Sequence, residues 1–284
     1  MSSDRINPAV LQSAQANNIK TKSNDELLAE LGLDIPQETV PIPSRGVIYS
    51  PDNALHMCET VDIRPMTTRE EDILTSRALL KKGTVINELI KSCLVDKRID
   101  VNSMLSGDKT ALMFAVRITG YGADYSAEIT CNECSEKFDY TFDLAQLGLK
   151  RLMIEPVTQG VNEFKFTLPV TKRDVMFKFL TGYDEDNISK TQEAAKKLGS
   201  RIDSNVTTKL VSCVTSIAGV QAGHHTISFI KNMPARDSLA LREFIDSNEP
   251  GVDTKQNCMC SKCGADQEVS IPIGINFLWP SARK

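Results

Sequence analysis

The sequence predicts an α+β fold made of two tandem copies of one unit, helical with a β-hairpin, joined by a shared four-cysteine site that resembles a zinc ribbon. Four cysteines form two Cys-x2-Cys motifs: Cys131 with Cys134, and Cys260 with Cys263. Matching cysteines lie 129 residues apart, and at this offset residues 104–134 and 233–263 are identical at eight of 31 positions without a gap. Self-similarity at a fixed spacing is typical of a repeated structural unit.

The first 60 residues are expected to lie outside the repeated units. Residues 1–22 are polar and without periodicity, which predicts a flexible N-terminal arm. Residues 23–60 predict a short helix followed by a proline-rich connector. Within this segment, leucines on one face favour an amphipathic helix over 23–32, and a short strand is expected at 46–49 between turn-forming prolines.

The first copy is assigned to residues 61–145. A proline, a threonine and an acidic residue at 64–74 indicate the start of a helix. Asp108 is expected to cap a further helix over 109–118, which should stop at the glycines that follow. Apolar and polar residues then alternate on both sides of the first cysteine motif, which predicts a hairpin with the motif at its turn.

The second copy is assigned to residues 146–275. Its segment 168–178 aligns with 64–74 and is therefore also expected to start a helix. A polar helix or loop is expected around 181–201, where the second copy carries extra residues. Residues 276–284 form an apolar C-terminal tail.

The composition limits the function. The chain has 284 residues and a net charge of −4, with 41% hydrophobic residues, so it can form a large core and has no broad basic surface for nucleic acid. No apolar run approaches the ~20 residues of a membrane-spanning helix. The N-terminal sequence lacks the features of a signal peptide, which predicts a reducing cytoplasmic environment.

In a reducing compartment, paired Cys-x2-Cys motifs indicate metal binding more often than disulfides. Each motif supplies two thiolates, so both together supply the four ligands of a closed tetrahedral structural Zn²⁺ site. We therefore expect Cys131, Cys134, Cys260 and Cys263 to share one zinc ion. Such a site has no open position for water, so the metal would not be catalytic.

The cysteine motifs also allow interpretations other than a zinc site. The motifs could form a redox dithiol, although redox motifs usually lie at a helix start and these lie between strands. They could also be inert thiols. Cys258 could replace Cys260 as a ligand. Cys93 and Cys213 lie among apolar residues and are expected in the core.

No pattern in the sequence predicts catalysis. The three histidines lie outside any metalloprotease or nucleophile motif, and no glycine-rich phosphate loop is found. We expect His224 and His225 to lie in a solvated turn. The acidic run 184–186 is expected to be a solvated surface. These observations favour a protein that is not an enzyme and has no small-molecule substrate.

The segments IPSRGVIY, IRPMTTREEDIL, GDKTALMFAVRITGYGADY, CNEC, CSKC and IPIGINFLWP, in this order, resemble the T4-type phage baseplate hub assembly proteins. The resemblance covers roughly residues 40–280. It implies a component or assembly factor of the hub of a contractile tail, with other baseplate or tail hub proteins as partners. It also implies a location in the host cytoplasm during assembly or in the tail baseplate of the virion. It supplies no catalytic residues.

The C-terminal apolar residues are the predicted partner-binding site. Phe277, Leu278 and Trp279 lie within eight residues of the end of the chain, where chains usually fray, and Trp is favoured at binding hot spots. The alternative is that these side chains fold back onto the core of the second copy.

The alternative function is a zinc-ribbon protein that binds nucleic acid. Such a protein needs basic and aromatic residues around its cysteine motifs. Five carboxylates and one lysine surround the first motif instead: Glu128, Glu133, Glu136, Asp139, Asp143 and Lys137. The sequence therefore favours a protein without nucleic-acid or membrane partners.

Overall fold

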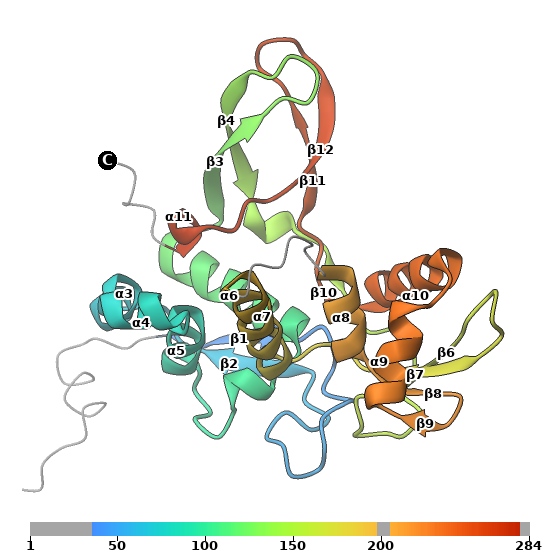
Figure 1. Ribbon diagram of the computed structural model, residues 1–284. Coiled ribbons are helices and arrows are strands. Elements are labelled where there is room, and N and C mark those ends of the chain that lie inside the picture. The colour runs from blue at the N-terminus through green and yellow to red at the C-terminus, as the bar shows by residue number, and fades with distance from the viewer. Residues whose placement is uncertain (1–35, 198–204, 279–284) are drawn as a thin grey trace, which may run out of the picture. The chain divides into compact units, whose positions relative to one another are not determined.

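The computed structural model in Figure 1 describes residues 36–197 and 205–278. The described residues from 37 onward form one compact unit of helices and small antiparallel sheets, which confirms the α+β class. The predicted arm and the helix expected at 23–32 lie outside the described residues. None of the described helices is long and apolar enough to span a membrane.

The described part begins with a two-stranded sheet. Strand β1 (Glu38–Pro41) pairs antiparallel with β2 (Thr60–Ile63). The strand expected at 46–49 is wrong, because these residues form consecutive turns. Arg45 and Gly46 have φ of 55° and 70°, and this left-handed backbone cannot continue as a strand.

A helical layer follows in the first half. Its elements are α3 (Thr68–Thr75), α4 (Arg77–Lys82), α5 (Val85–Cys93), the 3₁₀ helix η1 (Val101–Ser103) and α6 (Ser106–Tyr121). The helix start predicted at 64–74 is confirmed. Thr67 is the N-cap of α3 and forms a capping box with Glu70.

Asp108 does not cap its own helix, because α6 begins two residues earlier at Ser106. Its side chain is fully buried and binds the loop 42–59 instead. The Ser44 N–H and hydroxyl donate to it at 2.9 and 2.6 Å, and the Tyr49 hydroxyl donates at 2.6 Å. Burial raises the pKa of Asp108, and these three donors oppose that effect. The carboxyl thus attaches an irregular loop to the central helix.

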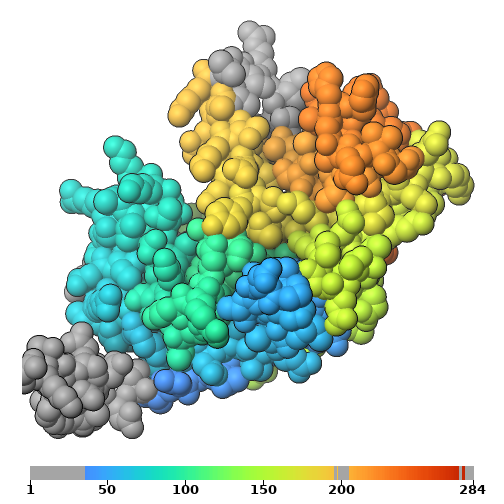
Figure 2. Space-filling model, turned by 90° about the horizontal axis from the view of Figure 1, so that it is seen from below, coloured from blue at the N-terminus to red at the C-terminus, as the bar shows by residue number. Residues whose placement is uncertain are grey.

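Two irregular loops lie side by side on the face of the molecule seen in Figure 2. Residues 42–59 (blue) lie beside residues 151–163 (yellow-green), which lead from the first half into the second. The Leu152 N–H donates to the Pro43 carbonyl at 3.0 Å, and the Gly160 N–H donates to the Val47 carbonyl at 2.9 Å. Backbone hydrogen bonds therefore hold both loops in place.

The second half contains a four-stranded antiparallel sheet in the order β6-β7-β8-β9. Its strands are β6 (Phe164–Thr167), β7 (Asp174–Phe177), β8 (Val214–Ile217) and β9 (Val220–Gln221). Its helices are α7 (Gly182–Lys197), α8 (Asn205–Cys213), α9 (His224–Lys231) and α10 (Ala235–Asn248). The helix start expected at 168–178 is wrong, because this segment forms a turn and strand β7. The insertion expected as a polar helix or loop contains helix α7.

A partly buried ion pair stabilises the start of the first helical layer. Arg64 donates to Glu70 at 2.7 Å, and the Glu70 side chain is fully buried. The N–H and hydroxyl of Thr67 donate to Glu70 at 2.9 and 2.6 Å. Ser92 of α5 adds a hydrogen bond of 2.5 Å. The carboxylate therefore joins the end of β2, the start of α3 and the end of α5.

The same arrangement recurs in the second half. Lys178 pairs with Asp184 at 2.7 Å, and Asp184 also accepts the N–H and hydroxyl of Thr181. The Arg64 N–H donates to the Cys93 carbonyl, and the Lys178 N–H likewise donates to the Cys213 carbonyl. The register that matches the two halves here is therefore 61–70 with 175–184. This structural correspondence differs from the alignment of 64–74 with 168–178.

Asp237 repeats the role of Asp108. Its side chain is buried in the first turn of α10 and accepts the N–H groups of Val170 and Thr171 at 2.7 and 3.0 Å. Burial alone would raise the pKa of Asp237, but these N–H donors outweigh it and lower the pKa. Helix α6 thus holds the loop after β1, and helix α10 holds the turn after β6.

The two halves pack into one unit. The Ser106 N–H donates to the Leu180 carbonyl at 2.9 Å, and the Gly182 N–H donates to the Met104 carbonyl at 3.0 Å. A Cβ atom at Gly107 would lie 1.7 Å from the Pro250 carbonyl oxygen, so only glycine permits this approach of α6. The described residues of both assigned segments, 61–145 and 146–275, therefore belong to one compact unit.

The C-terminal apolar residues pack inside the chain. Helix α11 (Ile275–Leu278) places the ring of Phe277 edge-to-face against the rings of Phe114 of α6 and Tyr125 of β3 (Asp124–Thr130). The ring centroids are 4.8 Å apart for Phe114 and 5.1 Å apart for Tyr125. Phe277 and Leu278 are buried, and Trp279 lies outside the described residues. The alternative expected these side chains to fold back onto the core of the second copy. The aromatic contacts of Phe277 are instead with residues of the first half. Buried side chains offer no surface to a partner, so partner binding through this tail stays a prediction.

Replacing Phe277 with alanine should lower the free energy of unfolding by about 3–5 kcal/mol, because it leaves a cavity between α6 and the neighbouring hairpin. Urea unfolding monitored by circular dichroism measures the change. Ile273→Ala is the control, since Ile273 is 42% exposed in the same segment. Equal stabilities for the two variants would contradict the packing of Phe277.

Acidification should destabilise the fold through Glu70. Burial alone would raise its pKa, but hydrogen bonds from Arg64, Ser92 and Thr67 lower it from 4.5 to about 2. A depressed pKa stabilises the folded state above the ordinary pKa, and this stabilisation is lost as the pH falls toward 2. At ~1.4 kcal/mol per pKa unit, the loss between about pH 5 and pH 2 is about 3 kcal/mol.

Urea unfolding at a series of pH values tests this linkage. Glu70→Gln should be less stable than the wild type at neutral pH and should show a shallower pH dependence. Asp72→Asn, at an exposed position of the same helix, should retain the wild-type slope. The same slope for the wild type and Glu70→Gln would contradict the role of the carboxylate.

Candidate metal centre

Two hairpins carry the cysteine motifs at their turns. The first contains β3 (Asp124–Thr130) and β4 (Lys137–Asp143), and the second contains β11 (Lys255–Met259) and β12 (Asp266–Ser270). Both are antiparallel, as predicted, and Figure 1 shows them side by side with their turns at the same end.

Short elements support the base of the hairpins. The 3₁₀ helix η2 (Leu144–Gln146) follows β4, with Asp143 as its N-cap. Strand β5 (Leu149–Lys150) then pairs antiparallel with β10 (Gly251–Val252), which precedes the second hairpin. The chain leaving the first hairpin is thus paired with the chain entering the second.

Each cysteine motif forms the same tight turn. The Ser135 N–H donates to the Cys131 carbonyl at 3.0 Å, and the Gly264 N–H donates to the Cys260 carbonyl at 3.0 Å. Ser135 and Gly264 are equivalent positions with φ of 58° and 73°. Glycine adopts this left-handed conformation without strain, whereas serine does so at a cost.

The two turns bring the four predicted sulfurs together. The Sγ atoms of Cys131, Cys134, Cys260 and Cys263 all lie within 4.8 Å of one another. Cys131 and Cys263 are 3.7 Å apart, as are Cys134 and Cys260. For Zn–S bonds of ~2.3 Å, a tetrahedron has S···S edges of about 3.8 Å. The donor set and these distances therefore fit a zinc ion.

The backbone of the second motif favours a thiolate. The N–H groups of Cys263 and Lys262 point at the sulfur of Cys260 and lower its pKa to about 6. The Ala265 N–H acts in the same direction on Cys263, but the neighbouring thiols raise the pKa of Cys263 to about 12. Four neighbouring thiolates repel one another, and a divalent cation would remove that repulsion.

Side chains beside the sulfurs also join the hairpins. Gln267 of β12 is buried, and its Oε1 accepts the Asn132 N–H at 2.8 Å. Its Nε2 donates to the Thr130 carbonyl at 3.4 Å. Lys262 pairs with Glu136 across the turns at 2.6 Å, in an exposed position. The hairpins thus have protein contacts in addition to any metal.

The remaining cysteines lie apart from the four-sulfur cluster. Cys258 is buried on β11 and accepts a hydrogen bond from Gln267 at 3.7 Å, so it does not replace Cys260 in the cluster. Cys93 and Cys213 are buried in the core, as predicted. Burial raises the pKa of both thiols to about 12.

One expectation for surface residues is wrong, and a second holds for only part of its segment. His224 and His225 begin helix α9 and do not lie in a solvated turn, although both are exposed. Two residues of the acidic run 184–186 form cross-links. Asp184 pairs with Lys178, as described above, and Glu185 pairs with Lys109 of α6 at 2.7 Å.

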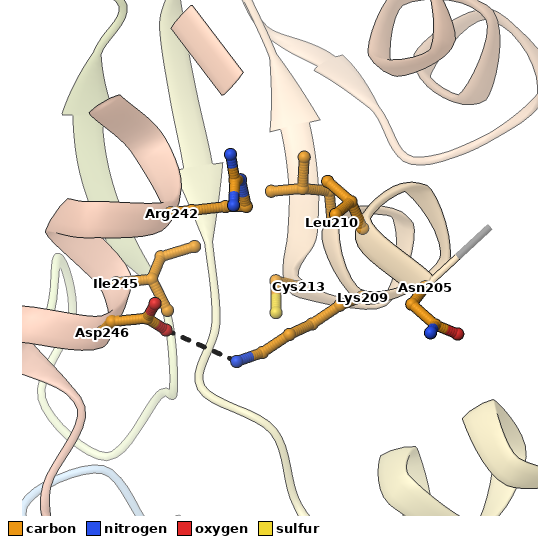
Figure 3. Close-up of a pocket in the computed structure, with 8 residues that line it drawn as sticks. Asn205, Lys209, Leu210, Cys213, Arg242, Ile245 and Asp246 are labelled. Carbon is orange, nitrogen blue, oxygen red and sulfur yellow. Dashed lines mark hydrogen bonds and ion pairs between the residues drawn. The ribbon is translucent and has the colours of Figure 1, made fainter. Parts of the chain in front are cut away.

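A pocket between α8 and α10 was not predicted. Figure 3 shows its lining, which includes Leu210, Cys213, Arg242 and Ile245, and Lys209 paired with Asp246 at 3.4 Å. The cavity measures about 250 Å³. The high pKa of Cys213 makes its thiol a weak nucleophile, because the thiolate is the reactive form. Neither periodicity nor a motif in the sequence indicates this pocket, since residues of two separate helices form it.

The sequence matches the family described as T4 bacteriophage base plate protein over residues 46–279. The chain belongs to this family. The match covers both cysteine motifs and nearly all of the described residues, so it confirms the resemblance inferred from the short motifs. No curated protein and no solved structure matches the chain.

Proposed function

We propose that this member of the base plate family is a component or assembly factor of the baseplate hub. It acts by binding other baseplate or tail hub proteins and does not catalyse a reaction. The family match over residues 46–279 carries this proposal. Its site of action is the host cytoplasm during assembly and the baseplate of the virion tail.

Zinc is the proposed structural cofactor. When bound, Zn²⁺ neutralises the thiolates of Cys131, Cys134, Cys260 and Cys263 and fixes the two hairpins relative to each other. The spacing of the sulfurs supports this ion, as does the lowered pKa of Cys260. A site with four protein ligands leaves no position for substrate, which supports a structural role.

The two halves are proposed to be tandem copies of one unit. The recurring ion pairs, the matching buried aspartates of α6 and α10, and the two cysteine hairpins support this interpretation. In this view the shared zinc ion joins the end of one copy to the end of the other.

Purified protein should contain about one equivalent of zinc by elemental analysis. Cys131→Ser and Cys263→Ser should each abolish binding, because one site needs ligands from both hairpins. Metal loss should also lower the melting temperature, since structural zinc binding is coupled to folding. Cys258→Ala is the matched control, because it removes a buried thiol from the same hairpin outside the cluster.

The result discriminates between the alternatives. Two equivalents would indicate separate sites, and full zinc content after Cys131→Ser would contradict a shared site. The redox dithiol would be favoured if the purified protein contained no zinc and mild diamide treatment oxidised two of its thiols.

The baseplate role is tested in phage-infected cells. An affinity-tagged protein should copurify with tail or baseplate proteins identified by mass spectrometry, and the captured set should be free of nucleic acid after high-salt washing. The hub assignment would be contradicted if the tagged protein captured no tail component from the lysate and was itself absent from purified tails.

A further inference from the structure

One continuous part of this acidic chain contains no carboxylate side chain. Residues 205–236 include three basic residues, two histidines and no Asp or Glu, although the whole chain has a net charge of −4. This stretch forms α8, β8, β9 and α9. Lys209 is paired with Asp246, whereas Lys231 and Arg236 are exposed. Carboxylates of neighbouring elements lie close by, but they have partners: Asp174 pairs with Lys165, and Glu163 accepts from Thr215. Lys231 and Arg236 thus give this part of the second half exposed positive charge.

An apolar groove lies in the same part of the second half. Ile217, Val220 and Phe229 form its apolar lining, and Arg173 and His225 also line it. Its volume is about 260 Å³, and Val220 is 54% exposed. No carboxylate among residues 36–197 and 205–278 pairs with Arg173. A partner with carboxylates would complement this surface.

The first cysteine hairpin has the opposite charge. Residues 124–143 carry six carboxylates and one lysine, a net charge of −5. On its exposed face, Asp124 lies directly opposite Asp143, and Glu128 lies directly opposite Asp139. Lys137 pairs with Glu128 at 2.8 Å, but the hairpin keeps a net charge of −5, which a basic partner surface would complement.

The two charged surfaces cannot meet within one molecule. Figure 1 shows the tip of the β3–β4 hairpin at one end of the described part, while β8, β9 and α9 lie at another. Complementary patches at different places on one chain favour a heterologous contact, in which one copy binds the next head to tail. Such contacts close into rings or continue as chains.

We propose that the acidic face of the β3–β4 hairpin docks on the basic surface of a second copy of this chain. The basic surface consists of the exposed residues Arg173, Lys231 and Arg236 and of the groove that Arg173 lines. This inference names one partner for the interaction role proposed above, but it needs neither zinc nor another phage protein.

Sedimentation equilibrium tests the contact with the full-length protein. The wild type should self-associate in a concentration-dependent manner, and the dissociation constant should rise about tenfold or more between about 0.05 and 0.5 M salt. The acidic-face variant is Asp124→Lys with Asp139→Lys. It converts both like-charge pairs into opposite-charge pairs, so the hairpin should stay at least as stable while self-association weakens about tenfold or more.

A compensating variant makes the test specific. Arg173→Glu with Lys231→Glu should also weaken self-association about tenfold or more. Mixing the two variants should restore it, because each then offers the charge that the other needs. Asp72→Lys with Glu193→Lys changes the net charge equally at other exposed positions and should leave the wild-type association intact.

A wild type that remains monomeric at all concentrations and salt conditions would overturn the proposal. So would two variants that remain dissociated after mixing, or a control pair that weakens association as much as they do. Each of these outcomes is distinct from failure of the baseplate role, which the copurification experiment measures separately.

Discussion

The meeting of the two cysteine hairpins is the constraint on which the rest of the structure depends. One hairpin follows α6 in the first half and the other follows α10 in the second, and 125 residues separate their cysteine motifs. Closing a loop of this length costs chain entropy. Three features hold this loop closed: the four-sulfur cluster, the buried Gln267 and the pairing of β5 with β10. With the hairpins held together, the tail after β12 can return to α6 and bury Phe277.

Two buried carboxylates fix irregular segments of the chain by accepting hydrogen bonds from them. Asp108 binds the turns after β1, and Asp237 binds the turn after β6. These segments lack the regular backbone hydrogen bonds of a sheet or helix, so a carboxylate that accepts several donors fixes them. A buried acceptor with fully formed hydrogen bonds is costly to disrupt, since its partners would remain buried without a substitute. Both long helices therefore determine the conformation of distant loops.

The fold of this base plate family member holds two surfaces of opposite charge at separate places on the chain. The interior connections fix the relative positions of an acidic hairpin and a basic, grooved surface. Burial raises the pKa of the Cys93 and Cys213 thiols, which makes them weak nucleophiles. A structural metal at the hairpin turns would hold the acidic face in a fixed orientation, which lowers the entropic cost of binding a partner.

The sequence by itself determined the α+β class, the family, the two hairpins, the helix start at Thr67 and the four residues of the sulfur cluster. These features depend on local patterns: alternation of polarity, capping residues and the spacing of cysteines. The sequence did not reveal the correspondence between the two ion pairs, because Arg64 with Glu70 and Lys178 with Asp184 share an interaction but not residue identity. It also missed the role of Asp108, since a carboxylate in a first helical turn looks like a cap until the loop that it binds is known. Only the tertiary structure decided that Phe277 and Leu278 are buried, because their packing site against Phe114 and Tyr125 comes from residues about 150 positions earlier in the chain.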